Sequence, residues 1–408
     1  MNSIRIIDKT RMRPIIIIML IALLFYSFFC LSFNQITEEK YASDIRVHIS
    51  FAKNGTGYSI LYTCLGVIIS IAGDNYPVWI ALFEALLMLL PIFPVSRWIK
   101  KSYGISLTVS LFISMGLLFL SSIYWPNIFS SFYISSIITQ PWHNITYYGM
   151  RLFAAIAICF FAECFPNYQK DFTILNWITI SLPLMIATWI KPNFFIAFSW
   201  TLLGFLIIDA FNGKWKKQVL VNCIKLGTTV FPSLLILYLH SRILYGGSSG
   251  NGESSGIEFV FFTSGFFGNG VWYAVLKLIR DLLFPFIVFG FSIKHNKLSR
   301  IEKFIYVQYF IALLQVICLR ETGPRAAAYN FYWTIFICSF FLFAVSVSHF
   351  INDIKINCLE NNQKPIQAIL LEKGHRVYFT CGSLLIMLHL ISGIVYFILI
   401  SRGSHYLI

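Results

Sequence analysis

Long apolar runs alternate with short polar segments along almost the whole chain. A helix needs roughly 20 apolar residues to cross a bilayer. Runs near this length occur at 14–33, 105–125, 147–165, 172–190, 193–210, 219–240, 271–292, 304–320, 331–349 and 377–401, and two more lie at 58–72 and 76–95. The pattern predicts an all-α fold, a polytopic integral membrane protein of about 11–12 transmembrane helices. Residues 1–408 would form a single transmembrane domain.

The composition excludes an ordinary soluble protein. Of the 408 residues, 58% are hydrophobic and only 12% are charged, whereas globular domains average about half apolar and a quarter charged. The 9 cysteines lie mostly within the apolar runs. They show no close pairing typical of zinc or redox sites, so we interpret them as small hydrophobic residues of the helical bundle.

The basic residues gather in short clusters between the apolar runs. Lys and Arg number 31 against 17 Asp and Glu, for a net charge of +14. The clusters follow the positive-inside pattern of cytoplasmic loops, which argues against nucleic acid as a partner and for membrane lipids. The pattern predicts a cytoplasmic N-terminus. It places outside the membrane a first loop at 34–57, a second at 126–146 and a flexible Gly- and Ser-rich loop at 241–270.

One segment leaves the topology open. Crossings at both 58–72 and 76–95 would return the chain to the outer side just before the basic sequence RWIKKS at 97–102, whose charge predicts the inner side. Either the short run 58–72 is re-entrant or interfacial, or RWIKKS is an exception to the charge rule.

The first outer loop holds the most informative polar residues. Asp44 and His48 lie four residues apart, so they share one side of a helix if this segment is helical. Ile45, Ile49 and Ala52 follow the same period, which predicts a helix lying along the membrane surface. Because ionisable side chains near the hydrocarbon are costly, each is a functional candidate by default.

Further ionisable and polar side chains are predicted at or near the same outer face. They are His143 and Asn144 at the mouth of a helix, Arg151 two turns along that helix, Lys191 in a tight turn, Glu321 and Arg325 in a late loop, and Lys277, Arg280 and Asp281 just inside the face. Cations at this surface can bind a phosphate or pyrophosphate, and a carboxylate can serve as a general base. Structural alternatives stay open: an internal ion pair for Lys277, Arg280 and Asp281, and an aromatic belt for His143 beside Trp142.

These residues carry a resemblance to a known family. A first outer loop of the form Asp-x-x-x-His-x-x-x-Ala, at Asp44, His48 and Ala52, resembles that of the polytopic GT-C glycosyltransferases of bacterial surface-polysaccharide synthesis. The segments WHNITYYGMR, KPNFF and GPRAAAYNFYW also look like pieces of such proteins. The resemblance implies a GT-C-like bundle with an outward-facing cavity, in a bacterial inner membrane.

The resemblance also implies an activity. The protein would transfer a sugar from a polyprenyl-phosphate-linked donor to a glycan or lipid acceptor, with Asp44 as the base. His48, His143 and Asn144 would contact the substrates, Lys191, Lys277, Arg280 and Arg325 would hold the phosphate, and Arg151 and Glu321 would shape the pocket. The chain departs from the family in having a single acid in this motif and no outer C-terminal domain, so we predict no cofactor and assert no divalent metal.

Two other functions remain open. A polymerase that joins lipid-linked oligosaccharide repeats, as in O-antigen or capsule assembly, would also need outward cations and a mobile outer loop. A lipid-linked sugar flippase or transporter would place Lys277, Arg280 and Asp281 at mid-bilayer, facing a path open to both sides. A transferase would instead place them with Asp44 in a cavity that opens outward and toward lipid.

Overall fold

Helices account for most of the residues that the structure describes. The computed structural model describes residues 9–55, 58–124, 139–245, 256–263, 266, 270–295, 297–323, 330–360 and 373–405. Most of the predicted loops 126–146 and 241–270, and Arg325, lie outside these residues. The helices are α1 (Lys9–Thr37), α2 (Ile45–Lys53), α3 (Ile60–Ala72), η1 (Gly73–Asn75), α4 (Tyr76–Leu89), α5 (Ile92–Tyr103), α6 (Leu107–Leu117), α7 (Ile145–Cys164), α8 (Ile174–Ile190), α9 (Asn193–Asn212), α10 (Lys217–Gly227), η2 (Thr228–Val230), α11 (Phe231–Tyr245), α13 (Val271–Lys294), α14 (Arg300–Cys318), α15 (Tyr332–Glu360) and α17 (Lys373–Ser401).

The predicted all-α, polytopic membrane architecture is confirmed at this level. Within the described residues, eight helical segments are long and apolar enough to cross a membrane, and α6 and α8 are shorter apolar helices. Their backbone groups are paired along each helix, as a bilayer requires. Polar side chains cap several helix starts, including Ser106 before α6, Thr173 before α8 and a capping box formed by Ser299 and Glu302 at α14.

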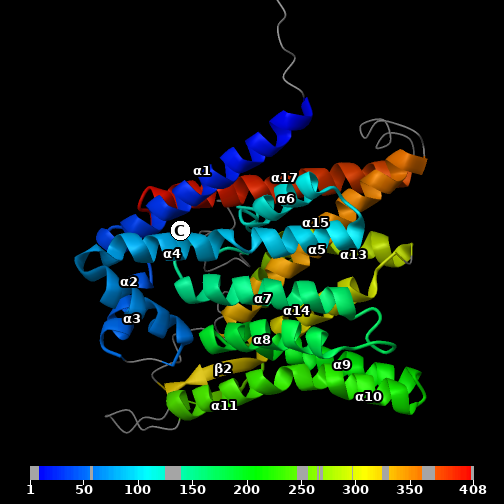
Figure 1. Cartoon of the computed structure of the whole chain (residues 1–408). Helices are drawn as coiled ribbons and strands as arrows, with labels where there is room; N and C mark the ends of the chain where they lie inside the picture. Colours follow the sequence, from blue (N-terminus) through cyan, green and yellow to red (C-terminus); the bar gives the residue numbers. More distant parts are fainter. Residues whose placement is uncertain are drawn as a thin grey trace, which may run out of the picture.

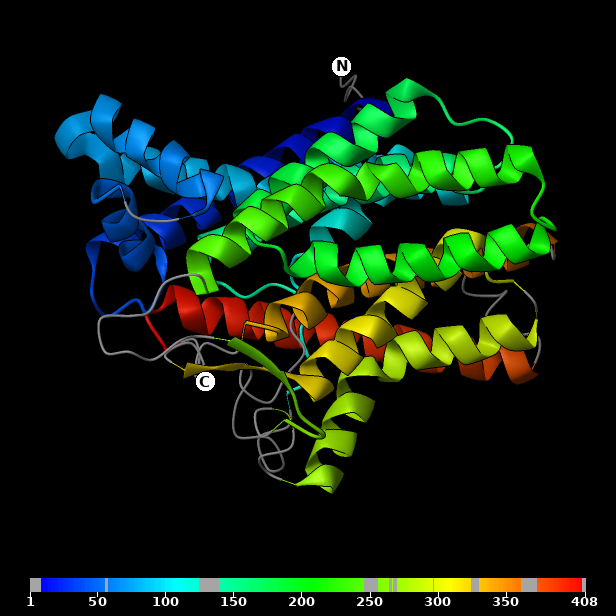
Figure 2. The same cartoon turned by 90° about the horizontal axis from the view of Figure 1, so that it is seen from below.

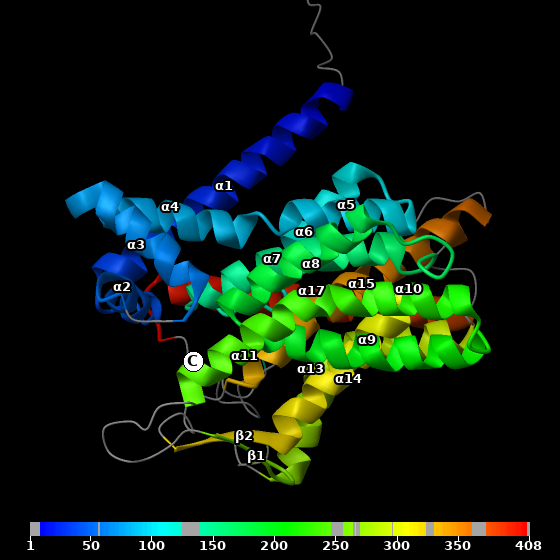
Figure 3. The same cartoon turned by 60° about the horizontal axis from the view of Figure 1, so that its bottom comes forward.

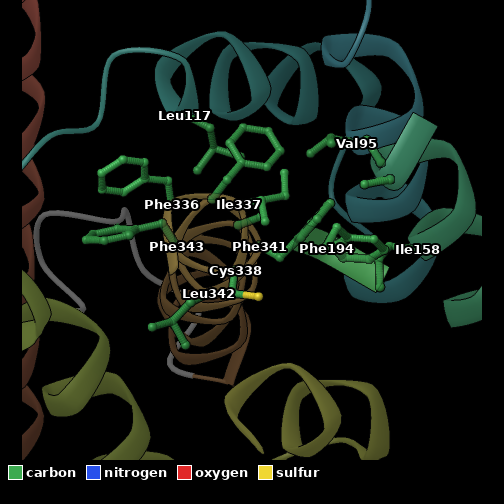
Figure 4. Packing of buried hydrophobic residues seen from close by; sticks show 14 of the residues in the cluster. Val95, Leu117, Ile158, Phe194, Phe336, Ile337, Cys338, Phe341, Leu342 and Phe343 are labelled. Atoms are coloured by element: carbon green, nitrogen blue, oxygen red, sulfur yellow. The ribbon is translucent and has the colours of Figure 1, made fainter. Parts of the chain in front are cut away.

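Helix α15 forms the centre of the bundle. Of its apolar stretch, 94% is buried, against 22% for α1 and for α17, so the outer helices present apolar side chains to the surroundings. Figure 4 shows how side chains of α15 interdigitate with those of α5, α6, α7 and α9; labelled are Val95, Leu117, Ile158, Phe194, Phe336, Ile337, Cys338, Phe341, Leu342 and Phe343. The close packing of these rings and branched side chains sets the relative positions of the helices.

The short run at 58–72 forms α3, a helix of 13 residues. At about 1.5 Å per residue, α3 is too short to cross the roughly 30 Å hydrocarbon layer. It packs on α2, α4 and α8 at one end of the bundle, whereas α4 and α5 follow one another along its length (Figure 1). Arg97 and the two lysines of RWIKKS therefore lie at the opposite end from α2 and α3.

The two ends of the bundle differ in charge. At one end, ion pairs join the helices: Arg97 with Glu163 at 3.2 Å, Lys101 with Glu163 at 2.8 Å, Lys297 with Asp353 at 3.6 Å, and Arg300 with Asp209. The opposite end carries α2, α3, the C-terminal part of α17 and the strand β2, at the left of Figure 1. Since α7, α9 and α15 run between the ends, most basic clusters are separated from α2 by the length of a helix.

Two short strands lie at the end that carries α2. Strand β1 (Gly256–Phe259) pairs antiparallel with β2 (Leu319–Thr322), with Ile257 opposite Glu321 and Glu258 opposite Arg320. Figures 2 and 3 show the pair beyond the end of α14. Directly opposite residues of an antiparallel pair point to one face, so Glu321 and Ile257 share a face, and the ion pair of Arg320 with Glu258 lies on the other.

A close helix contact predicts a strong effect at one glycine. A Cβ at Gly393 in α17 would overlap the backbone carbonyl of Phe119, whereas one at Gly290 in α13 would meet no atom within 4 Å. We expect Gly393→Ala to destabilise the protein by about 1–3 kcal/mol through overpacking. The matched control Gly290→Ala should be neutral or slightly stabilising, because alanine favours helix.

The measurement is the melting temperature of the detergent-solubilised protein, determined by size-exclusion chromatography of samples heated to increasing temperatures. Equal melting temperatures for the Gly393 and Gly290 variants would contradict the packing of α17 on the segment after α6.

Candidate functional site

A cavity of about 1050 Å³ opens at the end of the bundle that carries α2. Its volume is at the upper end of the range for small-molecule sites. Its described lining comes from α2, α3, α7, α8, α9, α11, α15, both strands and the adjoining turns: Asp44, His48, Phe51, Tyr58, Tyr62, Asn144, Thr146, Ile190, Lys191, Pro192, Asn193, Ile196, Leu234, Leu237, Tyr238, His240, Ser241, Ile257, Glu321, Asn330, Phe331 and Trp333.

Asp44 stands at the start of α2 and faces this cavity. Ile45 and Ile49 are buried and hold the helix against the bundle, as their spacing predicts. The Asp44 carboxylate makes no capping bond to α2. Instead it accepts a hydrogen bond of 2.8 Å from Nδ2 of Asn144, and its backbone N–H donates to the carbonyl of His143 at 3.0 Å.

Asn144 joins α2 to α7. It is the N-cap residue of α7, and its Oδ1 accepts from the backbone N–H of Tyr147 at 2.9 Å and from Oγ1 of Thr146 at 2.5 Å. Because the same amide donates to Asp44, the position of the carboxylate depends on the start of a membrane-spanning helix. Asn144 is buried, whereas the Asp44 carboxylate that it holds is half-buried and lines the cavity.

Lys191 contributes the positive charge of the cavity. It follows α8 directly with extended backbone angles, and α9 begins after Pro192. Its Nζ donates to Oγ1 of Thr146 at 3.3 Å and lies 3.7 Å from the centre of the Trp333 ring. Among the described lining residues it is the single Lys or Arg, and the ring face stabilises its charge by a cation–π contact.

His48 and His143 flank Asp44 and are held neutral. Burial lowers the pKa of His48 to about 4; the charge of Lys191 adds to this shift and Asp44 opposes it. Burial also lowers the pKa of His143 to about 4, against the effect of Asp44. Nδ1 of His48 lies 3.2 Å from the Tyr62 hydroxyl oxygen. His48 lines the cavity, whereas His143 lies beside it, with its ring 5.8 Å from that of Trp333.

Glu321 of β2 is the second carboxylate among the described lining residues. Its Oε2 accepts a hydrogen bond of 2.6 Å from Nδ2 of Asn330. The backbone carbonyl of Asn330 in turn accepts from Nδ2 of Asn193 at 2.7 Å. A carboxylate–amide chain therefore connects β2 to the start of α9, and it offers further hydrogen-bonding groups to the cavity.

The remaining predicted residues lie elsewhere. Arg151 is fully buried in α7, donates to the carbonyl of Met88 at 3.0 Å and contacts two aromatic rings. Lys277 and Arg280 are buried in α13 and do not line the cavity; Arg280 pairs with Asp281 at 2.6 Å. Their shared helix face was predicted, but that face packs inside the bundle. Arg325 lies outside the described residues.

The cavity also contains residues that the sequence analysis did not select. His240 in α11 and the tyrosines Tyr58 and Tyr62 contribute polar groups and rings. A histidine within the apolar run 219–240 was a signal that could have found the first of these, because such residues are rare in membrane helices. The tyrosines carried no signal beyond their general preference for membrane interfaces.

No protein-family model matches the chain, and no curated protein shows significant similarity to it. Within the described ranges, no three His, Cys, Asp or Glu side chains come together in a group that could hold a metal ion. The geometry of the cavity therefore carries the functional argument.

The depressed pKa of His48 predicts a pH dependence of stability. Its pKa falls from 6.5 to about 4 on folding. Between these pH values the unfolded chain therefore binds a proton at His48 that the folded protein does not bind. Stability is fully present above pH 6.5 and falls as the pH drops toward 4. We expect His48→Gln to reduce the loss in melting temperature between pH 7 and pH 5 by roughly 2 °C.

The matched control is His295→Gln, a change at an exposed histidine near the basic end of the bundle, which is the end opposite α2. This variant should show the pH dependence of the unsubstituted protein. An unchanged pH dependence in His48→Gln would contradict the burial of a neutral imidazole at this position.

Proposed function

We propose that this protein is a glycosyltransferase that moves a sugar from a polyprenyl-phosphate-linked donor to a glycan or lipid acceptor on the outer face of the membrane. The observation that carries the proposal is that the carboxylate of Asp44 and the only Lys or Arg among the described lining residues, Lys191, line the same cavity. This reaction requires at least a general base for the acceptor hydroxyl and a cation that stabilises the leaving phosphate. The process served would be surface polysaccharide or glycolipid synthesis.

The charge of the two ends supports the outward orientation. The clusters around Arg97, Lys214, Lys297 and Lys355 lie at the end opposite the cavity, and basic loops favour the cytoplasmic side. In the described part of the chain, the eight candidate spans, the shorter helices α6 and α8, and the 24-residue helix α13 would make eleven crossings. An odd number would leave the two chain ends on opposite sides of the membrane. With the basic clusters on the inner side, the N-terminus would lie inside and the cavity outside, and the membrane would be the inner membrane of a bacterium.

The residues of α11 that line the cavity suit a lipid-linked donor. Leu234 and Tyr238 line the cavity and are 45% and 59% exposed on a segment long and apolar enough to cross the membrane. Ile257 of β1 also lines it and is 55% exposed. Exposed apolar side chains on such a segment favour lipid over water, which supports an opening of the cavity toward the lipid. An apolar chain could lie there while its phosphate reaches Lys191.

In the proposed reaction, Asp44 takes the proton of an acceptor hydroxyl group. The oxygen of that hydroxyl attacks the anomeric carbon of the donor sugar. A new glycosidic C–O bond forms, and the C–O bond between that carbon and the phosphate breaks. Lys191 stabilises the negative charge that grows on the departing lipid phosphate. Asn144 keeps the Asp44 carboxylate in place, and the neutral His48 offers hydrogen bonds to the sugar or the acceptor.

A repeat-unit polymerase would use the same groups and differ only in the length of the donor glycan. For a flippase or transporter, the structure offers less support. All described lining residues come from the end of the bundle that carries α2, and the buried Lys277, Arg280 and Asp281 are not among them. The polar groups thus gather at one surface, as chemistry on one side of the membrane requires.

The test is substitution of the proposed base. Asp44→Asn keeps the shape of the side chain and the acceptor for Asn144 but removes its basicity. We expect transfer to fall at least about 100-fold, since general base catalysis contributes about 10² to 10⁴. The measurement is complementation of surface-glycan production in a deletion strain, with membrane abundance and accumulated lipid-linked precursor determined in parallel.

Asp74→Asn is the control, because Asp74 is exposed in η1 outside the cavity; it should support normal glycan levels. Full activity of Asp44→Asn at normal abundance would overturn the proposed mechanism and favour a flippase or transporter function.

A further inference from the structure

One wall of the cavity is built from aromatic and imidazole rings. His48 stacks on Tyr62 with ring centres 5.6 Å apart, Tyr62 contacts Tyr58 at 6.3 Å, and Tyr58 contacts His240 at 4.9 Å. The four residues come from α2, α3 with the residue that leads into it, and α11, and all line the cavity. We call this row of four side chains the ring wall. It contains no Lys, Arg, Asp or Glu.

The hydrogen bonds of His240 define which ring nitrogen can accept. Its Nε2 lies 3.2 Å from the backbone carbonyl oxygen of Tyr58. A carbonyl only accepts, so Nε2 carries the proton and Nδ1 of the neutral ring presents a lone pair. Nδ1 is buried and has no hydrogen-bond partner among the described residues, and His240 is only 3% exposed. An unpaired buried acceptor is costly unless a ligand or water satisfies it.

His48 repeats this arrangement at the other end of the ring wall. Its Nδ1 faces the Tyr62 hydroxyl, while its Nε2 is buried and has no partner within the described ranges. Each end of the wall therefore has one ring nitrogen engaged by the protein and one buried ring nitrogen without a partner among the described residues. The faces between them are the two tyrosine rings.

We propose that the ring wall is the subsite for a neutral sugar ring of the acceptor, a deduction that rests on the proposed transferase function. Nδ1 of His240 selects a group that donates a hydrogen bond, such as a hydroxyl or an acetamido N–H. A phosphate at neutral pH has little to donate and would gain nothing there. The aromatic faces match the C–H faces of a pyranose, and Asp44, four residues before His48 on α2, faces the same space.

This assignment divides the cavity by chemistry. The wall with Lys191 and Thr146 takes the phosphate of the donor, and the uncharged ring wall takes the acceptor. Asp44 lies where the two substrates meet, since it contacts Asn144 beside Thr146 and belongs to the helix that carries His48.

The test uses two substitutions that separate the nitrogens of His240. The amide of Gln reaches about as far as Nε2, so His240→Gln keeps a donor for the Tyr58 carbonyl and loses the acceptor at Nδ1. The amide of Asn reaches about as far as Nδ1, so His240→Asn keeps that acceptor and loses the tie to Tyr58. A merely structural role predicts that the Asn variant is the more damaging, whereas ligand binding predicts the reverse.

The probes are neutral monosaccharides added to the full-length protein in detergent and followed by saturation-transfer NMR. The panel holds glucose, galactose, mannose, rhamnose and N-acetylglucosamine, with inorganic phosphate tested separately. We expect at least one sugar to bind. Its affinity should fall about five- to tenfold in His240→Gln, through the loss of one hydrogen bond, and stay within about twofold in His240→Asn.

His389→Asn is the matched control. Its Nδ1 lies 2.7 Å from the carbonyl oxygen of Ser121 and its Nε2 has no partner in the described part of the chain, but it does not line the cavity. It should leave sugar binding unchanged. Absence of binding by every sugar, or a larger loss in His240→Asn than in His240→Gln, would overturn the proposal.

The outcome is distinguishable from failure of the proposed function. Asp44→Asn should keep sugar binding at the ring wall while it loses transfer. If the sugar and His240 results hold but Asp44→Asn retains full transfer, the subsite stands and the mechanism at Asp44 falls. If Asp44→Asn loses transfer but no sugar binds the unsubstituted protein, the mechanism stands and the subsite falls.

Discussion

The hydrogen bonds of Asn144 connect the fold to the chemistry of the site. A bilayer forces backbone groups into helices, so unpaired N–H groups are concentrated at helix starts. Asn144 satisfies the start of α7 through its Oδ1 and holds the Asp44 carboxylate through its Nδ2. One amide thus ties a surface helix to a membrane-spanning helix. Most of the charged and amide groups of the cavity stand at helix ends and in turns, where the helical backbone leaves room for polar side chains.

The same constraint explains where the charges lie. Lys191 stands in the turn between α8 and α9, and Glu321 lies on a short strand that follows α14. Both sit where the helical backbone stops, so polar groups can approach them. Lys277, Arg280 and Arg151 lie within helices and are enclosed by other side chains. Their charges are met inside the bundle by Asp281, by a carbonyl or by aromatic rings, which suits a structural role in holding helices together.

Much of this arrangement could be predicted from the sequence, because a bilayer leaves few choices. The apolar runs indicated the helices, and the period of Ile45 and Ile49 indicated α2 and the shared side of Asp44 and His48. Prediction stopped where the outcome depends on which helices are neighbours. The face of α13 that carries Lys277 could not be oriented, and His240 gains its meaning only because α11 brings it against Tyr58. The pattern of the run at 58–72 likewise could not indicate that it forms a short helix, α3, packed against α2 and α8.

The central claim is that the cavity holds the phosphate of a lipid-linked sugar at Lys191. Its most direct test is a cryo-electron microscopy map of the protein in lipid nanodiscs with added polyprenyl phosphate. The account predicts phosphate density within hydrogen-bonding distance of Lys191 Nζ, with the prenyl chain leaving past Leu234 and Tyr238. Density only at the basic end of the bundle, or an unoccupied cavity at saturating lipid, would contradict it.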